Sequence, residues 1–270
     1  MDKTKKYLIF LITYSLIITG IYVFRIGGKH FIALTTIINY VTLMVPLLFG
    51  YLTIKSLGLK NQIGKSALFL SLSIISLLLG DFLWDLSGRA VLSIADVFYF
   101  SYYPLLIIGI VIIIKSFSPT FFKKRKKLYF FGLISLAALL IYVKFFPVSW
   151  NYEASVIENI VTYGYTIADF SLIFLIFLIV PLIFSEVYRQ TWICVGLSLI
   201  TYWSGNIIYS IMYDTYKQGD LVDLIWLFSY LVFAWALILL RYNAEKVLGK
   251  IESKLEKGKS PPKRVITNKP

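Results

Sequence analysis

Eight runs of apolar residues, each close to 20 residues long, dominate the amino-acid sequence of this chain. A helix needs about 20 consecutive apolar residues to cross the hydrocarbon core of a bilayer. Hydrophobic residues make up 59% of the 270 residues and charged residues only 15%. A soluble domain would carry about a quarter charged residues. The sequence therefore predicts an all-α integral membrane protein with eight transmembrane helices, at 7–24, 31–54, 66–86, 91–114, 128–146, 160–184, 190–213 and 221–241.

Lysine and arginine residues are unevenly distributed between the two sides that eight spans would create. Both termini would lie on one side, and that side carries 22 of the 27 Lys and Arg residues, against 5 on the other. An excess of Lys and Arg in short loops marks the cytoplasmic side. The sequence therefore predicts a multi-pass protein of the cell membrane with both termini in the cytoplasm. This topology accounts for the basic charge, so we expect no nucleic-acid partner.

Acidic and aromatic residues recur as two similar sets near the outer ends of the predicted spans. Their order, spacing and depth agree, and the segment 45–49 also matches 180–184. We therefore predict two tandem four-helix repeats, about 7–115 and about 128–241, with the same orientation in the membrane. Chance similarity between apolar segments is the alternative. The matched pairs are Gly80 with Gly205, Asp81 with Asn206, Asp96 with Asp223, Tyr99 with Trp226, and Tyr103 with Tyr230.

Asp169 stands apart from these sets, because it lies about nine residues into the span at 160–184, near the bilayer midplane. Carboxylates inside a bilayer are costly and usually face a cavity or a partner. Aromatic rings attract cations, most strongly in a dry site. The sequence therefore predicts an outward-facing pocket for a small, cationic or amphiphilic molecule. Its candidate residues are Asp81, Trp84, Asp96, Tyr99, Tyr103, Tyr165, Asp169, Asn206, Tyr209, Asp223, Trp226 and Tyr230.

Two structural roles compete with this interpretation. Tyr and Trp are enriched at membrane interfaces whatever the function of the protein. Acidic residues also favour helix N-termini, and Asp96 and Asp223 lie where two predicted spans begin. Helix capping is therefore the alternative role for these two carboxylates.

Two longer patterns run through the acidic and aromatic sets. The first is Gly80-Asp81-x-x-Trp84, Ala95-Asp96-Val97-x-Tyr99 and Tyr103-Pro104-Leu105-Leu106 with Gly109; the second is Asp169, Gly205-Asn206-x-x-Tyr209 and Asp223-x-x-Trp226-x-x-x-Tyr230. Over most of residues 66–241 they resemble the N-terminal multi-helix membrane-sensor region of signalling proteins with diguanylate cyclase, phosphodiesterase or histidine kinase domains. The resemblance implies a sensor, and it implies no particular ligand. No such output domain follows Arg241 in the printed sequence, so we expect a separate cytoplasmic partner.

The segment 242–270 is predicted to form a cytoplasmic amphipathic helix followed by a basic disordered tail. The last predicted span continues past Arg241 with a short apolar stripe of 4-3-4 spacing, formed by Ala244, Leu248, Ile251 and Leu255. Such a stripe is typical of a short coiled coil, and packing on the membrane surface is an equal alternative. We expect it to contact a cytoplasmic signalling partner or a second copy of the chain.

Residues for catalysis and metal binding are scarce. The chain has one histidine, His30, and one cysteine, Cys194, which cannot form the usual zinc site. No glycine-rich phosphate loop or His-Glu-x-x-His motif is present. The leading hypothesis is therefore a membrane-embedded sensor or ligand-binding module that is not an enzyme and has no cofactor. A small transporter or ion-coupled carrier is the alternative, and an intramembrane lipid-modifying enzyme is the third.

Overall fold

The computed structural model describes residues 3–87, 93–117, 136, 152, 155–183, 187–212 and 215–256. Within these ranges seven helices are long and apolar enough to cross a membrane, which confirms the prediction of an all-α, multi-pass membrane type. Apart from residue 136, the predicted span at 128–146 lies outside the described residues. The helices are α1 (Lys3–Val23), α2 (Phe31–Leu57), α3 (Gln62–Leu86), α4 (Ala95–Phe117), α6 (Val156–Ile183), α7 (Arg189–Met212) and α8 (Leu221–Glu256), with a short 3-10 turn, η1 (Gly28–His30).

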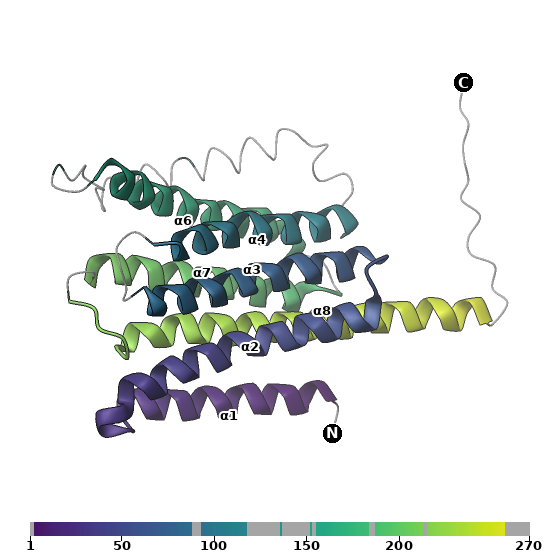
Figure 1. Ribbon diagram of the computed structural model, residues 1–270. Helices are drawn as coiled ribbons and strands as arrows, with labels where there is room; N and C mark the ends of the chain where they lie inside the picture. The colour runs from purple at the N-terminus through teal and green to yellow at the C-terminus, as the bar shows by residue number, and fades with distance from the viewer. Residues whose placement is uncertain are drawn as a thin grey trace.

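The long helices lie side by side and run back and forth along one direction (Figure 1). We call the end where α2, α4, α6 and α8 begin the acidic end, and the opposite end the basic end. Hydrogen bonds between helices show which helix ends lie together. Tyr165 in α6 donates to Asp96 at the start of α4, and Gln218, just before α8, donates to Thr36 near the start of α2. The first residues of α1 and the last turns of α8 both lie at the basic end.

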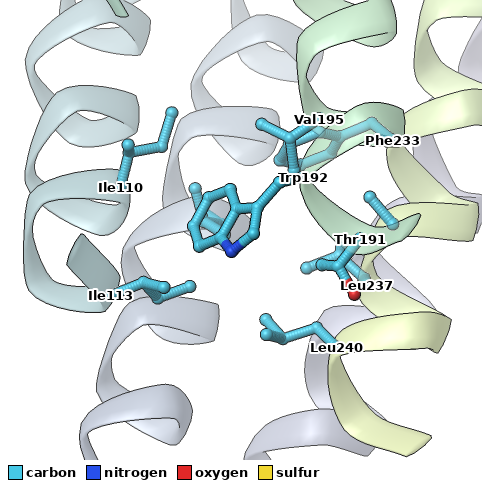
Figure 2. A pocket seen from close by; sticks show the side chains of 10 residues that line it. Ile110, Ile113, Thr191, Trp192, Val195, Phe233, Leu237 and Leu240 are labelled. Carbon is cyan, nitrogen blue, oxygen red and sulfur yellow. The ribbon is translucent and has the colours of Figure 1, made fainter. Parts of the chain in front are cut away.

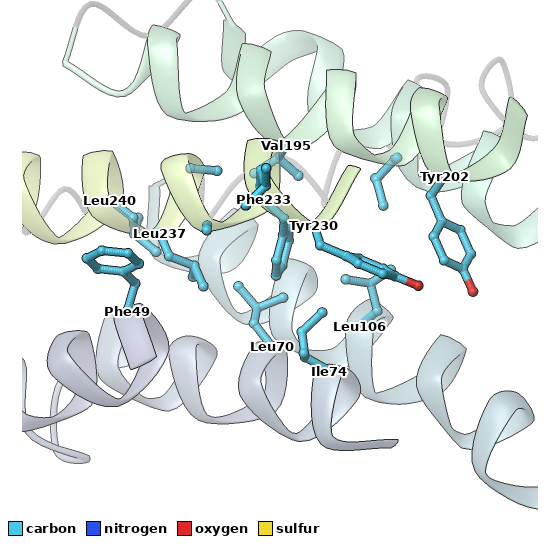
Figure 3. Packing of buried hydrophobic residues seen from close by; sticks show 14 of the residues in the cluster. Phe49, Leu70, Ile74, Leu106, Val195, Tyr202, Tyr230, Phe233, Leu237 and Leu240 are labelled. Carbon is cyan, nitrogen blue, oxygen red and sulfur yellow. The ribbon is translucent and has the colours of Figure 1, made fainter. Parts of the chain in front are cut away.

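Six helices pack in a closed order around the apolar interior. α2 contacts α3, α3 contacts α4, α4 contacts α6, α6 contacts α7, α7 contacts α8, and α8 returns to α2, while α1 packs outside on α8. Figure 3 shows side chains of α8 between those of α7 and those of α2 and α3. α8 is therefore the element that ties the bundle together. Its fully buried side chains include Leu227, Ala234, Leu237 and Leu240.

The outer surface of the bundle is apolar, as a lipid environment requires. Leu16 of α1 is 67% exposed, and Ile37 and Met44 of α2 are more than half exposed. Apolar patches of this extent on a soluble monomer would be unusual. The outward-facing side chains and the helix lengths therefore agree on a bundle that is surrounded by hydrocarbon.

Helix ends follow from local sequence. Asn61 caps α3, because its side chain accepts a hydrogen bond from the backbone N–H of Ile63 at 2.8 Å. Gly58 ends α2 with φ of 70°, a conformation that favours glycine. Ser155 and Glu158 form a capping box at the start of α6, in which each backbone N–H is bonded by the other side chain.

Two glycines allow aromatic rings to approach the backbone of neighbouring helices. A Cβ placed on Gly80 of α3 would lie 2.7 Å from the ring of Tyr99 on α4. A Cβ placed on Gly205 of α7 would lie 2.5 Å from the ring nitrogen of Trp226 on α8. Both contacts are too short for a real side chain, so these two positions need glycine to keep the helix pairs at their observed spacing.

Replacing Gly205 with alanine should therefore destabilise the protein. We expect Gly205→Ala to lower the free energy of unfolding by about 1–3 kcal/mol, the usual cost of overpacking. Gly20→Ala is the matched control, because nothing lies within 4 Å of a Cβ at Gly20. Thermal unfolding in detergent measures both. Equal melting temperatures for the two variants would contradict the packing described here.

Candidate functional site

Asp169 on α6 is the centre of one hydrogen-bonded cluster of predicted site residues. Its Oδ1 accepts from the hydroxyl of Tyr103 on α4 at 3.0 Å and from Asn206 Nδ2 on α7 at 2.6 Å. The Oδ1 of Asn206 in turn accepts from Trp226 Nε1 on α8 at 2.9 Å. Asp169 is 6% exposed. Four predicted site residues from four helices therefore meet at one point.

Helices α4 and α6, which meet at this cluster, are offset along their axes. Tyr165 is level with Asp96, the second residue of α4, so α6 projects past the start of α4 at the acidic end. Asp169 follows Tyr165 by four residues, or about 6 Å along the helix. Because neighbouring helices are offset, counting residues along one span does not show which residues lie level with each other. The position of Asp169 near the bilayer midplane stays a prediction.

Asp81 on α3 is the centre of a second cluster. Its Oδ2 accepts from Asn39 Nδ2 on α2 at 2.7 Å, and its Oδ1 accepts from the hydroxyl of Tyr99 on α4 at 2.7 Å. One turn further along α3, Asp85 accepts from the hydroxyl of Tyr40 on α2 at 2.6 Å. Both donors to Asp81 are neutral, and each of these bonds joins two helices.

Asp96 and Asp223 begin helices α4 and α8. Asp96 Oδ2 accepts from the backbone N–H of Ser93, and Asp223 Oδ2 accepts from the backbone N–H of Gly219, each at 2.8 Å. Such bonds satisfy backbone donors that have no partner within the helix. The alternative role in capping therefore applies to both residues.

The second oxygen of each cap binds a tyrosine hydroxyl. Asp96 accepts from Tyr165 at 2.5 Å, and Asp223 accepts from Tyr216, in the loop before α8, at 2.8 Å. Burial raises the pKa of Tyr216 well above its ordinary value, and the nearby charge of Asp223 and the bond to it act in the same direction. The Tyr216 hydroxyl therefore stays protonated and remains a donor.

The other predicted site residues lie around these clusters. The ring of Tyr209 packs against that of Trp226, with centroids 5.7 Å apart, and against that of Tyr216 at 5.0 Å. Trp84 is half-buried on α3, one residue before Asp85. These residues surround the polar clusters at the acidic end.

Tyrosine rings form a layer beneath the Asp169 cluster. The ring of Tyr102 lies 5.1 Å from that of Tyr103 and 5.2 Å from that of Tyr202, and the ring of Tyr202 lies 6.2 Å from that of Tyr230. All four side chains are less than 9% exposed. Figure 3 shows the hydroxyls of Tyr202 and Tyr230 on the side away from Leu240, toward the acidic end. The predicted residue Tyr230 belongs to this layer.

Sequence reasoning missed five residues of this region: Asn39, Tyr40, Tyr102, Tyr202 and Tyr216. Asn39 is an amide in the outer half of a predicted span, which is the signal that a search for neutral donors would have found. Tyr102 and Tyr202 carry no such signal, because 20 tyrosines occur in the chain and many face lipid interfaces.

The ion pairs in the described ranges lie outside the Asp81 and Asp169 clusters. In the ranges that the structure describes, ion pairs join Arg25 to Asp220 at 3.9 Å and Arg241 to Glu245 at 2.8 Å. Neither pair includes a carboxylate of the two central clusters. Asp81 and Asp169 are therefore held by neutral hydrogen-bond donors.

An internal cavity of about 10 Å³ lies in the apolar interior toward the basic end. Figure 2 shows Trp192 pointing into it between side chains of α4 and α8. Trp192 is 1% exposed, and its Nε1 has no partner among the described residues. A space of this size holds at most one water molecule. The cavity is therefore a packing feature separate from the acidic end.

A search against protein-family models, curated proteins and solved structures returned no match for this chain.

Asn206 bridges the buried Asp169 and the half-buried Trp226, so its loss should be costly. We expect Asn206→Leu to lower the free energy of unfolding by about 2–5 kcal/mol, because both Asp169 and the Trp226 indole lose a partner. Ser204→Ala is the control on the same helix, since Ser204 is half-buried and its hydroxyl donates to the carbonyl of Ile200 in its own helix. Chemical unfolding in detergent micelles measures both variants. A cost for Asn206→Leu no greater than for Ser204→Ala would show that the bridge is dispensable.

Proposed function

We propose that this protein is a membrane-embedded sensor that binds a small cationic or amphiphilic molecule at the acidic end and signals at the basic end. The observation that carries the proposal is that the buried Asp169 and the half-buried Asp81 accept hydrogen bonds from neutral donors. Such a region has a negative potential in a medium of low dielectric constant, which favours a positively charged ligand. The aromatic rings around it add cation–π attraction.

α8 provides the physical connection between the two ends. It carries Asp223, Trp226 and Tyr230 near its start and continues without interruption to Glu256. At the basic end, Glu245 of α8 accepts a hydrogen bond from Ser56 near the end of α2. A shift of α8 at the acidic end would therefore be transmitted to contacts near the cytoplasmic face.

The apolar stripe beyond Arg241 is the proposed contact with a cytoplasmic partner or a second copy. Ala244 is 2% exposed and so packs within its own bundle, whereas Leu248 is 39% exposed. Leu248 is therefore the described member of the stripe that a partner would reach.

We also propose that the bundle consists of eight spans in two four-helix repeats. The ring contacts of Gly80 with Tyr99 and of Gly205 with Trp226 support this proposal, because they join equivalent positions of α3 with α4 and of α7 with α8. A carboxylate also pairs with an amide between α2 and α3 and between α6 and α7.

The eighth span would lie between α4 and α6. These two helices both begin at the acidic end, so the chain between them has to return from the basic end. One crossing by the apolar segment at 128–146 would accomplish this. The same crossing would place both termini on one side of the membrane.

A small transporter or ion-coupled carrier is the alternative function. A buried carboxylate between two repeats, as proposed for Asp169, is common in such proteins. Ligand-dependent flux into proteoliposomes would favour the carrier, and ligand binding without flux would favour the sensor.

Topology can be tested with the single cysteine of the chain removed. In a Cys194→Ser background, Lys29→Cys should react with a membrane-impermeant maleimide in intact cells, because Lys29 lies in the proposed outer loop. Lys60→Cys is the control and should react only after permeabilisation. Both residues are exposed at opposite ends of the bundle. The reverse labelling pattern would place the acidic end in the cytoplasm.

The sensor hypothesis predicts that ligand binding is read out at α8. An environment-sensitive fluorophore can be attached at Lys246→Cys in the Cys194→Ser background. A cationic amphiphile that binds to the protein in nanodiscs should then change the fluorescence emission of this label. Asp81→Asn should weaken the apparent affinity by about tenfold, equivalent to about 1.4 kcal/mol, through loss of negative charge. Asp220→Asn is the control, because Asp220 pairs with Arg25 at the loop. If amphiphiles bind and no emission change follows, the module does not signal through α8.

A further inference from the structure

An open groove of about 440 Å³ lies at the acidic end, where α1 and α7 end and α8 begins. Two charged residues line it, Arg25 in the turn after α1 and Asp220 just before α8. Its other lining residues are apolar and belong to the last turns of α7 and the first turns of α8: Ile208, Met212, Leu221, Val222 and Ile225. No site residue predicted from the sequence is part of this lining. The groove is therefore separate from the Asp81 and Asp169 clusters.

The lining is charged beyond the helix ends and apolar further along the helices. Asp220 directly precedes α8, and Ile225 follows it by five residues, or about 7.5 Å along the chain direction. On α7, Ile208 lies one turn, about 6 Å, before Met212, the last residue of that helix. The headgroup layer of a bilayer is about 5–7 Å thick on each side. The lining therefore changes from charged to apolar over a depth similar to that layer.

The surroundings of Arg25 indicate that it lies at the boundary between hydrocarbon and water. Its neighbours Phe24 and Ile26 are apolar, and both are more than half exposed. An arginine among exposed apolar side chains keeps its charged group at the level of the lipid headgroups. Arg25 is therefore placed where lipid phosphates occur.

Two contacts position the Arg25 guanidinium without enclosing it. It lies 5.8 Å from the centroid of the Phe31 ring and 3.9 Å from Asp220 Oδ1. A nitrogen–oxygen distance of 3.9 Å is too long for a hydrogen bond. The Arg25 side chain is 74% exposed. The guanidinium is therefore held at the groove and remains accessible to a ligand.

We infer that this groove binds one phospholipid from the leaflet at the acidic end, with the lipid phosphate at Arg25 and part of an acyl chain against the apolar wall.

Charge complementarity favours a phospholipid over other occupants. The guanidinium presents a planar fork of N–H donors that matches the oxygens of a phosphate, and basic pockets between transmembrane helices bind lipid headgroups. A cationic amphiphile would be repelled by Arg25. A lipid without phosphate would contact the apolar wall alone, and free phosphate would contact Arg25 alone. A phospholipid matches both parts of the groove.

The inference goes beyond the proposed function, because it concerns a different site and a different ligand. α1 packs on α8, outside the closed order of six helices. A lipid in the groove would contact the end of α1 together with α7 and α8. It would therefore help to hold α1 on the bundle.

The test uses the full chain, freed of native lipid, in a nonionic detergent, and measures the melting temperature by tryptophan fluorescence. Dioleoylphosphatidylglycerol is the probe, because its phosphate is its only charged group. Dioleoylglycerol supplies the same acyl chains without phosphate, and inorganic phosphate supplies the charge without chains. We expect a saturable rise in Tm of at least about 3 °C with the phospholipid, at roughly a hundredfold excess over Kd. Neither of the other two compounds should give a comparable rise.

A charge variant assigns the response to Arg25. Arg25→Gln keeps a polar side chain and should weaken the phospholipid affinity at least about tenfold, because charge-assisted bonds to phosphate are lost. Its Tm without lipid should stay close to that of the unchanged protein, since exposed ion pairs contribute little to stability. Lys217→Gln is the matched control, because Lys217 is exposed at the same end and does not line the groove. Its lipid response should equal that of the unchanged protein.

A second variant tests the apolar wall. Ile208→Trp places a larger apolar side chain in the groove and should reduce the phospholipid response although Arg25 is still present.

The inference is overturned if the phospholipid gives no saturable rise, or if Arg25→Gln responds to it as strongly as Lys217→Gln does. It is also overturned if dioleoylglycerol or inorganic phosphate raises Tm equally, because the groove would then recognise only an apolar chain or only an anion. The proposed sensor function fails separately, since it is measured with a cationic amphiphile and the label at Lys246→Cys.

Discussion

The acidic end of this bundle depends on one constraint: a carboxylate that is removed from water needs hydrogen-bond donors. Here the donors to Asp81 and Asp169 are amide and hydroxyl groups on neighbouring helices, so each bond also fixes the spacing of two helices. Removing a carboxylate therefore affects packing as well as charge. The hydrogen-bond network and the candidate binding site are made by the same residues.

The two ends of the bundle are built differently. Toward the basic end the interior is apolar and close-packed, with side chains of α8 filling the space between neighbouring helices (Figure 3). Toward the acidic end the interior is polar and aromatic. α8 belongs to both regions, so it is the element best placed to link an event at one end with a contact at the other.

Much of the candidate site could be predicted from the sequence, because buried carboxylates are rare in apolar spans. Asp169, Asn206 and Trp226 were predicted and do meet in one cluster. Asn39 and Tyr202 could not be found this way, since their positions matter only through the helices they face. The capping bonds of Asp96 and Asp223 were an open alternative that required backbone geometry to resolve.

The sequence by itself determined the class of structure, because runs of about 20 apolar residues have no other stable arrangement than membrane-spanning helices. It also placed Asp169 inside an apolar span, and the structure buries this residue. Only the tertiary structure decided which donors meet each carboxylate. That depends on the offset between neighbouring helices, such as the projection of α6 past the start of α4, and this offset results from side-chain packing that no single segment encodes.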